Sequence, residues 1–171
     1  AKGHQDFVVV TLGTGVGSGF VVNGQLVNGH DGFAGELGHT TVERGGRLCG
    51  CGRRGCLETY ASATGIVRTA QERLATYSGD SLLKGMETIS AHAIAQCAEQ
   101  GDALALEIFD STADYLGFSL ANTVAITSPA LIVLYGGLAQ AGDLIVRPTK
   151  KYLEQYMLNI FQNKVQIQLS T

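Results

Sequence analysis

The sequence predicts one α/β domain over residues 1–171, built on a mixed β-sheet. Three observations carry this prediction. Near the N-terminus, an apolar run precedes an Asn-Gly dipeptide that lies between two further apolar runs, which is typical of antiparallel strands. Beyond residue 60 the chain alternates between helical periodicity and short β-branched runs. A chain of 171 residues is also long enough to bury a substantial core.

The composition excludes several classes of protein. Charged residues make up 16% of the chain, below the roughly 25% of an average domain, and the apolar content of 45% excludes a disordered chain. The net charge of −3 argues against a basic nucleic-acid binder, so we expect no nucleic-acid partner. The longest purely apolar run, Ala130–Tyr135, is far shorter than the ~20 residues of a membrane span, so we expect no membrane partner.

Glycine is unusually frequent, because the chain has 23 glycines and only two prolines. The glycines are concentrated between Gly13 and Gly65 and follow no Gly-X-Y period, which excludes a collagen. This concentration indicates a site that is built from backbone turns.

The first predicted elements form a three-stranded antiparallel meander. Phe7–Leu12 is apolar and β-branched, as expected of a buried strand. The glycine-rich segment Gly13–Gly19 follows it. The runs Phe20–Val22 and Gln25–Val27 then flank Asn23-Gly24, which is the strongest short hairpin pattern.

Three helices are predicted in the middle of the chain. The first spans Ala61–Tyr77, and Gly79 is expected to stop it. The second spans Ser90–Ala98, with the serine as its cap. Asp102 caps the long third helix, which Ser128-Pro129 ends. The apolar residues of this helix recur mostly at three- and four-residue steps, at Leu104, Ile108, Phe109, Ala113, Leu116, Leu120 and Val124.

The last predicted elements complete the sheet. Leu131–Tyr135 is a second buried strand, and Gly136-Gly137 follows it. Leu144–Phe161 has helical periodicity, and we expect Pro148 in its first turn, where proline is tolerated. Val165–Leu169 alternates apolar and polar residues, as strands do. The order βββ-α-β-α-β therefore predicts a mixed five-stranded sheet with helices.

The segment 29–55 has neither helical nor strand periodicity, and such a long irregular segment usually marks a site or a metal. It contains His39, Cys49, Cys51 and Cys56 in the pattern His-x9-Cys-x-Cys-x4-Cys. Three thiolates and one imidazole suit tetrahedral Zn²⁺. Disulfides or free thiols are the alternatives, but Cys49 and Cys51 are too close in sequence to pair easily.

The glycine-rich segment Gly13–Gly17 is a candidate phosphate site. It is not a Walker loop, because no Gly-Lys-Ser/Thr follows, and a hairpin follows where a dinucleotide fingerprint needs a helix. Backbone N–H groups in such a turn can hold a phosphate because no Cβ blocks the approach, and Thr14 adds a hydroxyl. A tight turn without any ligand is the alternative.

Taken together, these motifs resemble the ROK family, which contains bacterial sugar kinases and sugar-responsive repressors. Leu12-x2-Gly15-Val16-Gly17-x-Gly19-Phe20, with Gly29 and Gly35-x2-Gly38-His39 further on, is similar to the family signature. The cysteine pattern is similar to the family's zinc motif, and the segment Cys51–Ser62 is most similar to its glucokinases. The resemblance covers essentially the whole chain.

The resemblance implies an actin-like, RNase H-like fold and an ATP-dependent hexose kinase, with glucose as the expected substrate. It also implies MgATP, a structural zinc ion, a homodimer and a cytoplasmic location. It places Glu36, His39 and Glu58 on sugar hydroxyls. The nucleotide-binding residues that it implies are Gly13, Thr14, Gly15, Gly17, Gly136 and Gly137. Without the resemblance, Glu36 is consistent with a solvated carboxylate on a loop. Glu58 is then consistent with a charge in the first turn of a helix.

Two features of the family's kinases are missing from this sequence. It has no Asp-x-Gly-Gly phosphate loop and no Asn-Asp pair to supply the general base. We therefore expect the C-terminal lobe alone, without its N-terminal lobe or closing helix and with no catalytic residue of its own. Because phosphoryl transfer needs a closed cleft, we expect the 171-residue chain alone to be inactive.

Two other functions stay open. The chain could be the sugar-sensing part of a ROK repressor, or a bare zinc scaffold that binds a partner. The complete glycine loop and the glucokinase-like segment favour the kinase. The arginines around the cysteines are expected to form a solvated loop face: Arg44, Arg47, Arg53 and Arg54.

Overall fold

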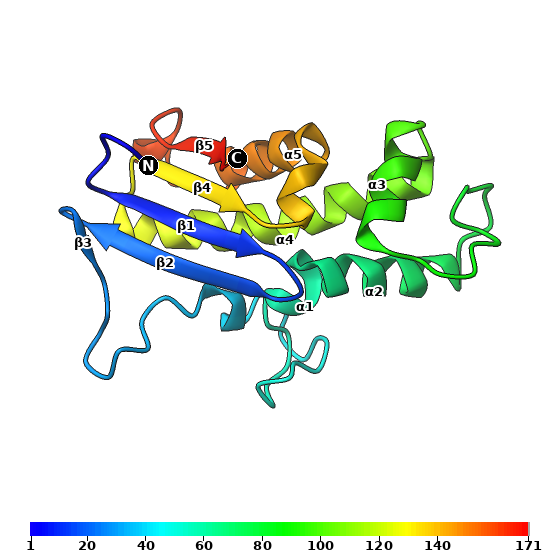
Figure 1. The fold of residues 1–171 in the computed structure, drawn as a ribbon, viewed down its shortest axis with the longest axis horizontal. Coiled ribbons are helices and arrows are strands. Elements are labelled where there is room, and N and C mark those ends of the chain that lie inside the picture. Colours follow the sequence, from blue (N-terminus) through cyan, green and yellow to red (C-terminus); the bar gives the residue numbers. More distant parts are fainter. Residues whose placement is uncertain (171) are drawn as a thin grey trace.

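A computed structural model describes residues 1–170 of the chain (Figure 1). Its strands are β1 (Phe7–Leu12), β2 (Val16–Val22), β3 (Gln25–Leu26), β4 (Leu131–Tyr135) and β5 (Gln166–Leu169). They form one sheet in the order β3-β2-β1-β4-β5. The β1–β2 and β2–β3 pairs are antiparallel, whereas β1–β4 and β4–β5 are parallel. The predicted mixed five-stranded sheet is confirmed.

The helices pack against this sheet and against one another. They are α1 (Glu58–Ala61), α2 (Ala63–Leu74), α3 (Ala91–Glu99), α4 (Ala103–Thr127) and α5 (Asp143–Tyr156), with short 3₁₀ turns η1 (Leu37–His39), η2 (Leu138–Ala141) and η3 (Asn159–Phe161). Helix α4 crosses behind the sheet in Figure 1 and packs along α5. Within residues 1–170, no helix combines the length and apolar character needed to cross a bilayer.

The core joins one face of the sheet to α4. Val8, Val10 and Leu12 of β1 belong to the same hydrophobic cluster as α4, whereas Phe7 and Val9 lie half-buried on the other face. The apolar positions predicted for α4 are all exposed by 1% or less. Each large apolar side chain buried in this way stabilises the fold by about 2 kcal/mol relative to exposure.

The turn in the glycine-rich segment is shorter than the sequence predicted. Strand β2 begins at Val16, so Gly17 and Gly19 are strand residues and only Gly13 to Gly15 turn the chain. The reason is the β1 register, because Leu12 already pairs with Val16.

Two predicted helices also differ from the structure. The first is divided at Ser62, whose extended backbone interrupts the helix and whose side chain accepts the N–H of Gly65 to cap α2. Helix α2 then ends at Leu74, before Gly79. Pro148 lies beyond the first turn of α5, so that prediction is wrong. The proline leaves one helical carbonyl, that of Leu144, without its usual donor.

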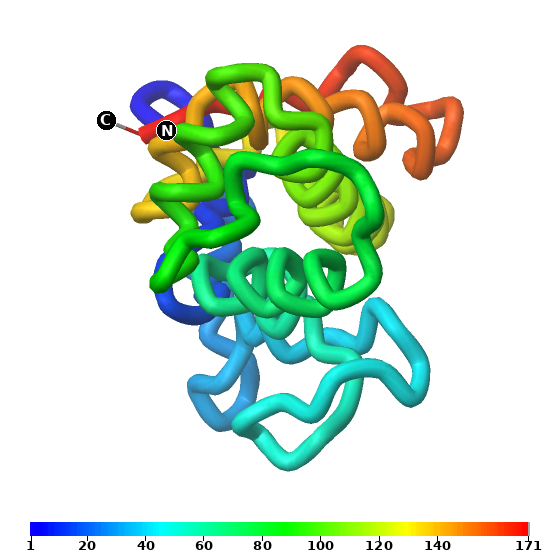
Figure 2. The backbone as a smooth tube through the Cα atoms, turned by 90° about the vertical axis from the view of Figure 1, so that its right-hand side faces the viewer, coloured from blue at the N-terminus to red at the C-terminus, as the bar shows by residue number. Residues whose placement is uncertain are grey.

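The segment between β3 and α1 lies at one side of the molecule. In Figure 2 it forms the lower part of the molecule, on the opposite side from α5. Apart from the turn η1, it has no regular helix or strand, and isolated bridges such as Thr41–Cys56 tie it together. The predicted irregular segment is therefore confirmed.

Candidate functional site

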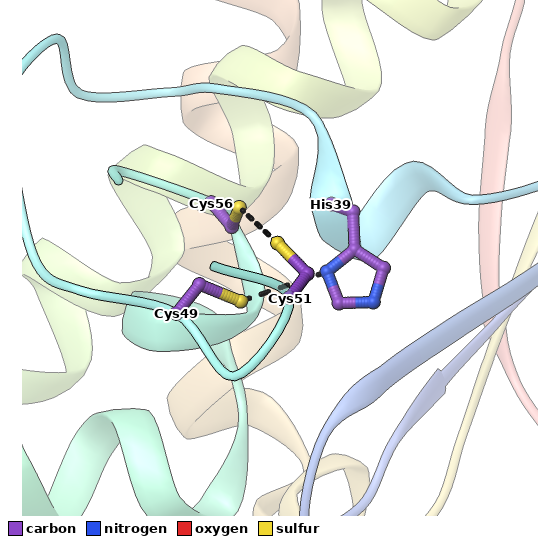
Figure 3. A group of neighbouring side chains, drawn as sticks. All are labelled: His39, Cys49, Cys51 and Cys56. Carbon is purple, nitrogen blue, oxygen red and sulfur yellow. Dashed lines mark hydrogen bonds between the residues drawn. The ribbon is translucent and has the colours of Figure 1, made fainter. Parts of the chain in front are cut away.

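The predicted metal ligands lie together (Figure 3). His39 ends η1, and its Nδ1 lies 3.6 Å from Sγ of Cys49. Sγ of Cys51 lies 3.6 Å from Sγ of Cys56, and all four donor atoms lie within 4.8 Å of one another. Tetrahedral zinc, with bonds of about 2.3 Å to sulfur, places its ligand atoms about 3.8 Å apart. The donor set and its spacing therefore fit a tetrahedral zinc ion, and the cysteines are all free thiols.

The sulfur atoms of this cluster lie in different environments. Cys49 and Cys56 are buried, whereas Cys51 is exposed. A hydrogen bond from the backbone N–H of Arg53 lowers the pKa of Cys51 to about 6. Burial raises the pKa of Cys56 to about 12. A metal ion that binds here therefore displaces a proton from Cys56, because thiolates are the metal ligands.

The loop around the cluster turns tightly at a glycine. Gly55 has a φ of +77°, and a Cβ there would lie 1.6 Å from the carbonyl oxygen of Glu43. Only glycine fits both the conformation and the space. The N–H of Cys49 donates to the carbonyl of Arg53 at 2.9 Å, which closes the turn that carries the cysteines.

Arg47 fastens this loop to the helices, so the predicted solvated arginine face is wrong at this position. Its side chain is only 9% exposed. It donates to the carboxylate of Glu72 at 2.5 Å and to the carbonyl of Thr59 at 2.6 Å. It also donates to the hydroxyl of Thr69 at 3.0 Å and lies 4.5 Å from the ring centroid of Tyr60. The loop is therefore anchored two positions before its first cysteine.

The second ring nitrogen of His39 faces away from the cysteines. Its Nε2 lies 3.9 Å from Oε2 of Glu36, whose side chain is largely exposed. When Nδ1 binds a metal, Nε2 carries the proton and becomes a fixed donor. An imidazole donor beside a carboxylate acceptor suits a ligand rich in hydroxyl groups.

Hydrogen bonds hold the turn between β1 and β2 in shape. The N–H of Gly17 donates to Oγ1 of Thr11 at 3.2 Å, and that of Gly13 donates to the carbonyl of Gly15 at 3.0 Å. The N–H groups of Thr14 and Gly15 have no acceptor within the described part of the chain. An anion can therefore bind these two amides. A turn in which every amide lacked an acceptor would offer more donors.

Glu58 lies between this turn and the cysteine cluster. It is the first residue of α1, which begins before the predicted start of the first helix at Ala61. Its Oε2 accepts the N–H of Val16 at 3.1 Å, and its Oε1 lies 3.7 Å from Sγ of Cys49. A Cβ at Gly15 would lie 2.1 Å from Oε2, so the carboxylate fills the space that this glycine leaves free.

The segment that carries His39 packs directly on β2. A Cβ at Gly38 would lie 2.0 Å from the carbonyl oxygen of Val16, and one at Gly35 would lie 2.9 Å from that of Ser18. These glycines let the two backbones approach each other. His39 is thereby fixed relative to the glycine turn.

An open cavity of about 390 Å³ joins the turn to Glu58 and to the end of β4. Its lining residues are Thr11, Gly13, Gly15, Val16, Gly17, Glu58, Tyr135 and Gly136. A second cavity, of about 500 Å³, lies next to Gly137 between α3 and η2 and has polar residues such as His92 and Gln96. Gly136 and Gly137 thus connect the two cavities, while Glu36, His39 and Thr14 lie outside both linings.

Two residues of the first cavity were missed from the sequence. Thr11 and Tyr135 are paired neighbours of β1 and β4 and lie on the same face as Phe7. The alternation of β1 could have identified Thr11, since it is the polar residue on that face. Tyr135 could not be identified without the register of β4.

Comparisons with known proteins come from both sequence and structure. A sequence profile described as ROK family matches residues 1–171. A glucokinase of Halalkalibacterium halodurans is 40% identical over 173 residues, which cover 99% of this chain and 52% of that protein. The DNA-binding transcriptional repressor Mlc of Escherichia coli is 30% identical over 168 residues, which cover 98% of this chain and 41% of the repressor.

Among solved structures, a ROK family glucokinase from Streptomyces griseus in complex with glucose and AMPPNP has the same fold. The TM-score is 0.85 at 33% identity, and the match covers 98% of this chain and 56% of that one. The expected actin-like fold is confirmed. The chain spans about half the length of the curated relatives that it matches.

Proposed function

The chain belongs to the ROK family, and from that premise we propose that it is the sugar- and nucleotide-binding lobe of an ATP-dependent hexose kinase. Glucose is the proposed acceptor and glucose 6-phosphate the product. One observation carries the proposal: the glycine turn and the carboxylate beside the cysteine cluster open onto one cavity. A kinase must hold its acceptor hydroxyl next to the transferred phosphoryl group.

At the sugar end, Glu36, His39 and Glu58 contact the hydroxyls. Ionised carboxylates are strong acceptors for hydroxyl donors, and a metal-bound imidazole presents a fixed N–H. The ligands His39, Cys49, Cys51 and Cys56 give zinc a closed shell, so its role is structural. Zinc orients a sugar contact and takes no part in phosphoryl transfer.

At the nucleotide end, the turn formed by Gly13, Thr14, Gly15 and Gly17 contacts the phosphates of MgATP. Support comes from the two amides without acceptors and from the open space beside Gly13. Gly136 and Gly137 follow β4 and lead to the cavity of about 500 Å³, which has room for adenosine.

The general base that activates the sugar hydroxyl is proposed to lie in a separate N-terminal lobe. The relatives' length supports this, because this chain spans about half of it. Phosphoryl transfer depends on positioning and on charge stabilisation across a closed cleft. The 171-residue chain alone is therefore expected to show no turnover of glucose with MgATP.

The proposal is tested by kcat/KM for a panel of sugars with MgATP on the full-length protein that contains this chain. We expect glucose to exceed N-acetylglucosamine and N-acetylmannosamine by about tenfold or more. Glu36→Gln should reduce kcat/KM for glucose, whereas Glu107→Gln, an equal charge change on the exposed surface of α4, should not. Failure to phosphorylate any sugar would refute the kinase.

A sugar-sensing part of a repressor is the second candidate function, and the similarity to Mlc favours it. The two functions differ in their need for nucleotide. A full-length protein that binds glucose but not MgATP, and that carries a DNA-binding helix-turn-helix, would be a repressor.

Two copies of the lobe are proposed to associate through α4 and the end of α5. Phe118 and Tyr156 meet edge to face at 5.6 Å, and both are partly exposed. Leu158 and Ile160 are more than half exposed just beyond α5. Burying these side chains favours association. Ile160→Asp should convert the dimer to a monomer in sedimentation experiments.

A further inference from the structure

The sulfur atoms of the metal cluster differ in their access to solvent. Cys51 is exposed, whereas Cys49 and Cys56 have only 3% and 0% of their surface exposed. The thiol of Cys97, in α3, is closed to solvent in the same way, with 1% exposed. Oxidation of cysteine depends on exposure and on the presence of the thiolate. A small oxidant in solution therefore meets the cluster at Cys51.

We propose that Cys51 and Cys56 are an oxidative modification site, at which a hydroperoxide converts the two side chains to a disulfide and thereby releases zinc. This inference rests on the proposed structural zinc ion and adds redox control to the proposed sugar site. Cysteines that bind zinc do so as thiolates, which are also the nucleophilic form. The form that reacts with a hydroperoxide is therefore the form that the zinc site requires.

Cys56 is the cysteine that is placed to complete the disulfide (Figure 3). Its Sγ lies 3.6 Å from Sγ of Cys51. The sulfur of Cys49 instead contacts Nδ1 of His39 at 3.6 Å and Oε1 of Glu58 at 3.7 Å. A single residue separates Cys49 from Cys51 in the sequence, which is too short a link for an easy disulfide.

The turn between the two cysteines leaves them free to approach each other. Gly52 and Gly55 have φ of +86° and +77°, so the chain reverses between Cys51 and Cys56 and brings them together. Residues 51–54 are all exposed, and none of them belongs to the hydrophobic core. The sulfur atoms can therefore close to the roughly 2.05 Å of a disulfide without disturbing that core.

The reaction balances with hydrogen peroxide as the oxidant. The Cys51 thiolate attacks one peroxide oxygen, the O–O bond breaks, and hydroxide leaves, so that Cys51 becomes a sulfenic acid. The Cys56 thiolate then attacks the Cys51 sulfur, the S–O bond breaks, and a second hydroxide leaves. The thiolates together lose the two electrons that the peroxide gains.

The disulfide removes half of the metal ligands. Only His39 and Cys49 are left, and a zinc site needs four ligands to be closed. Without a metal on Nδ1 of His39, Nε2 is no longer fixed as the donor beside Glu36. Oxidation should therefore weaken sugar binding. A thiol reductant should reverse the effect, because a disulfide can be reduced by thiol exchange.

The test treats the full-length, zinc-loaded protein with hydrogen peroxide. A chromophoric chelator follows zinc release, and peptide mass spectrometry identifies the disulfide. We expect a disulfide between Cys51 and Cys56, an equimolar release of zinc, and a free thiol at Cys49. Glucose affinity in calorimetry should fall about tenfold or more and should return when dithiothreitol and zinc are added. Cys97→Ser is the matched control and should respond as the unaltered protein does.

A second measurement identifies the cysteine that reacts first. Dimedone, which traps sulfenic acids, should label Cys51 when it is present during oxidation of the unaltered protein, and should leave Cys49 and Cys56 unlabelled. Label on either buried cysteine in place of Cys51 would contradict the inference.

The outcomes separate this inference from the proposed function. If peroxide releases no zinc, or if the disulfide includes Cys49, the inference is wrong, even when the protein phosphorylates glucose. If the purified protein holds no zinc, the metal proposal fails, and the inference fails with it. If the disulfide forms with zinc release but no sugar is phosphorylated, the kinase proposal fails and the oxidative site stands.

Discussion

The α4 core and the metal loop, residues 39–58, are stabilised by different means. In α4, apolar side chains along the whole helix are buried, so stability is spread over many contacts. In the metal loop, the buried apolar side chains are few: Cys49, Cys56 and Leu57. Hydrogen bonds such as those of Arg47 supply the remaining stabilisation of the loop. Damage to the core should therefore lower global stability, whereas damage to the loop should remain local.

Loss of a metal ligand is the largest expected effect. Cys56→Ser should weaken zinc binding by roughly a thousandfold or more, because one of the four ligands is lost. Hydrogen exchange should then quicken across residues 39–58 while α4 stays protected. Competition with a chromophoric chelator measures the affinity. Cys97→Ser, at a buried cysteine of α3 outside the cluster, is the matched control and should keep stoichiometric zinc.

A cavity made in the core should lower the free energy of unfolding and leave zinc binding unchanged. Leu116 is fully buried, and Leu116→Ala should cost about 3 kcal/mol of the free energy of unfolding, measured in urea. Zinc content should not change. A variant that keeps its stability but loses zinc would show that the two regions are not separable.

Arg47 tests whether the loop is held by specific geometry rather than by charge alone. Arg47→Lys keeps the charge, but lysine cannot reach the Thr59 carbonyl, the Thr69 hydroxyl and Glu72 together. We expect a loss of about 2 kcal/mol, reduced by the half-exposed position of Glu72. Zinc should dissociate faster from the variant. Equal dissociation rates would mean that the loop does not need this anchor.

The smallest expected effect lies at the start of α4 and depends on pH. Burial alone raises the pKa of Asp102, but the N–H groups of Ala105 and Leu82 outweigh it, so the net pKa is lowered. A carboxyl with a lowered folded-state pKa adds stability above its unfolded pKa of about 3.9, and this stability is lost as pH falls through the folded pKa. Asparagine keeps one acceptor for the N–H of Ala105 but places an NH2 group against the N–H of Leu82, so Asp102→Asn should cost about 1 kcal/mol at pH 7.

The same variant should approach the stability of the unaltered chain as the acid limit is reached. Thermal unfolding of both proteins between pH 2 and pH 7 measures this convergence. A constant difference across that range would show that the charge of Asp102 contributes nothing.

The sequence was most informative where local spacing determines structure. Helical periodicity identified the buried face of α4, and the spacing of His39 and the cysteines predicted four side chains that the structure brings together. Arg47 could not be separated from the neighbouring arginines, because its partners Thr59 and Glu72 lie far along the chain. The break at Ser62 was missed because a capping serine fits an amphipathic pattern as well as a helical residue does.

The cavity residues show the same limit. Glycine spacing indicated the turn, but the occupied Val16 amide depends on Glu58, which is 42 positions away. Gly35 and Gly38 were noted as parts of a motif, and their physical role is the close approach to β2. Such contacts between segments that are distant in sequence require the fold.

The most direct test of the account is a crystal structure of the full-length protein with zinc, glucose and AMPPNP bound. We expect zinc on His39 and the three clustered cysteines, glucose hydroxyls on Glu36, His39 Nε2 and Glu58, and the phosphates at the Gly13–Gly17 turn. The opposite result is a sugar or nucleotide bound elsewhere, such as the cavity along α4 and α5 near Asp110 and Tyr152. That result would contradict the central claim that the metal loop and the glycine turn form one site.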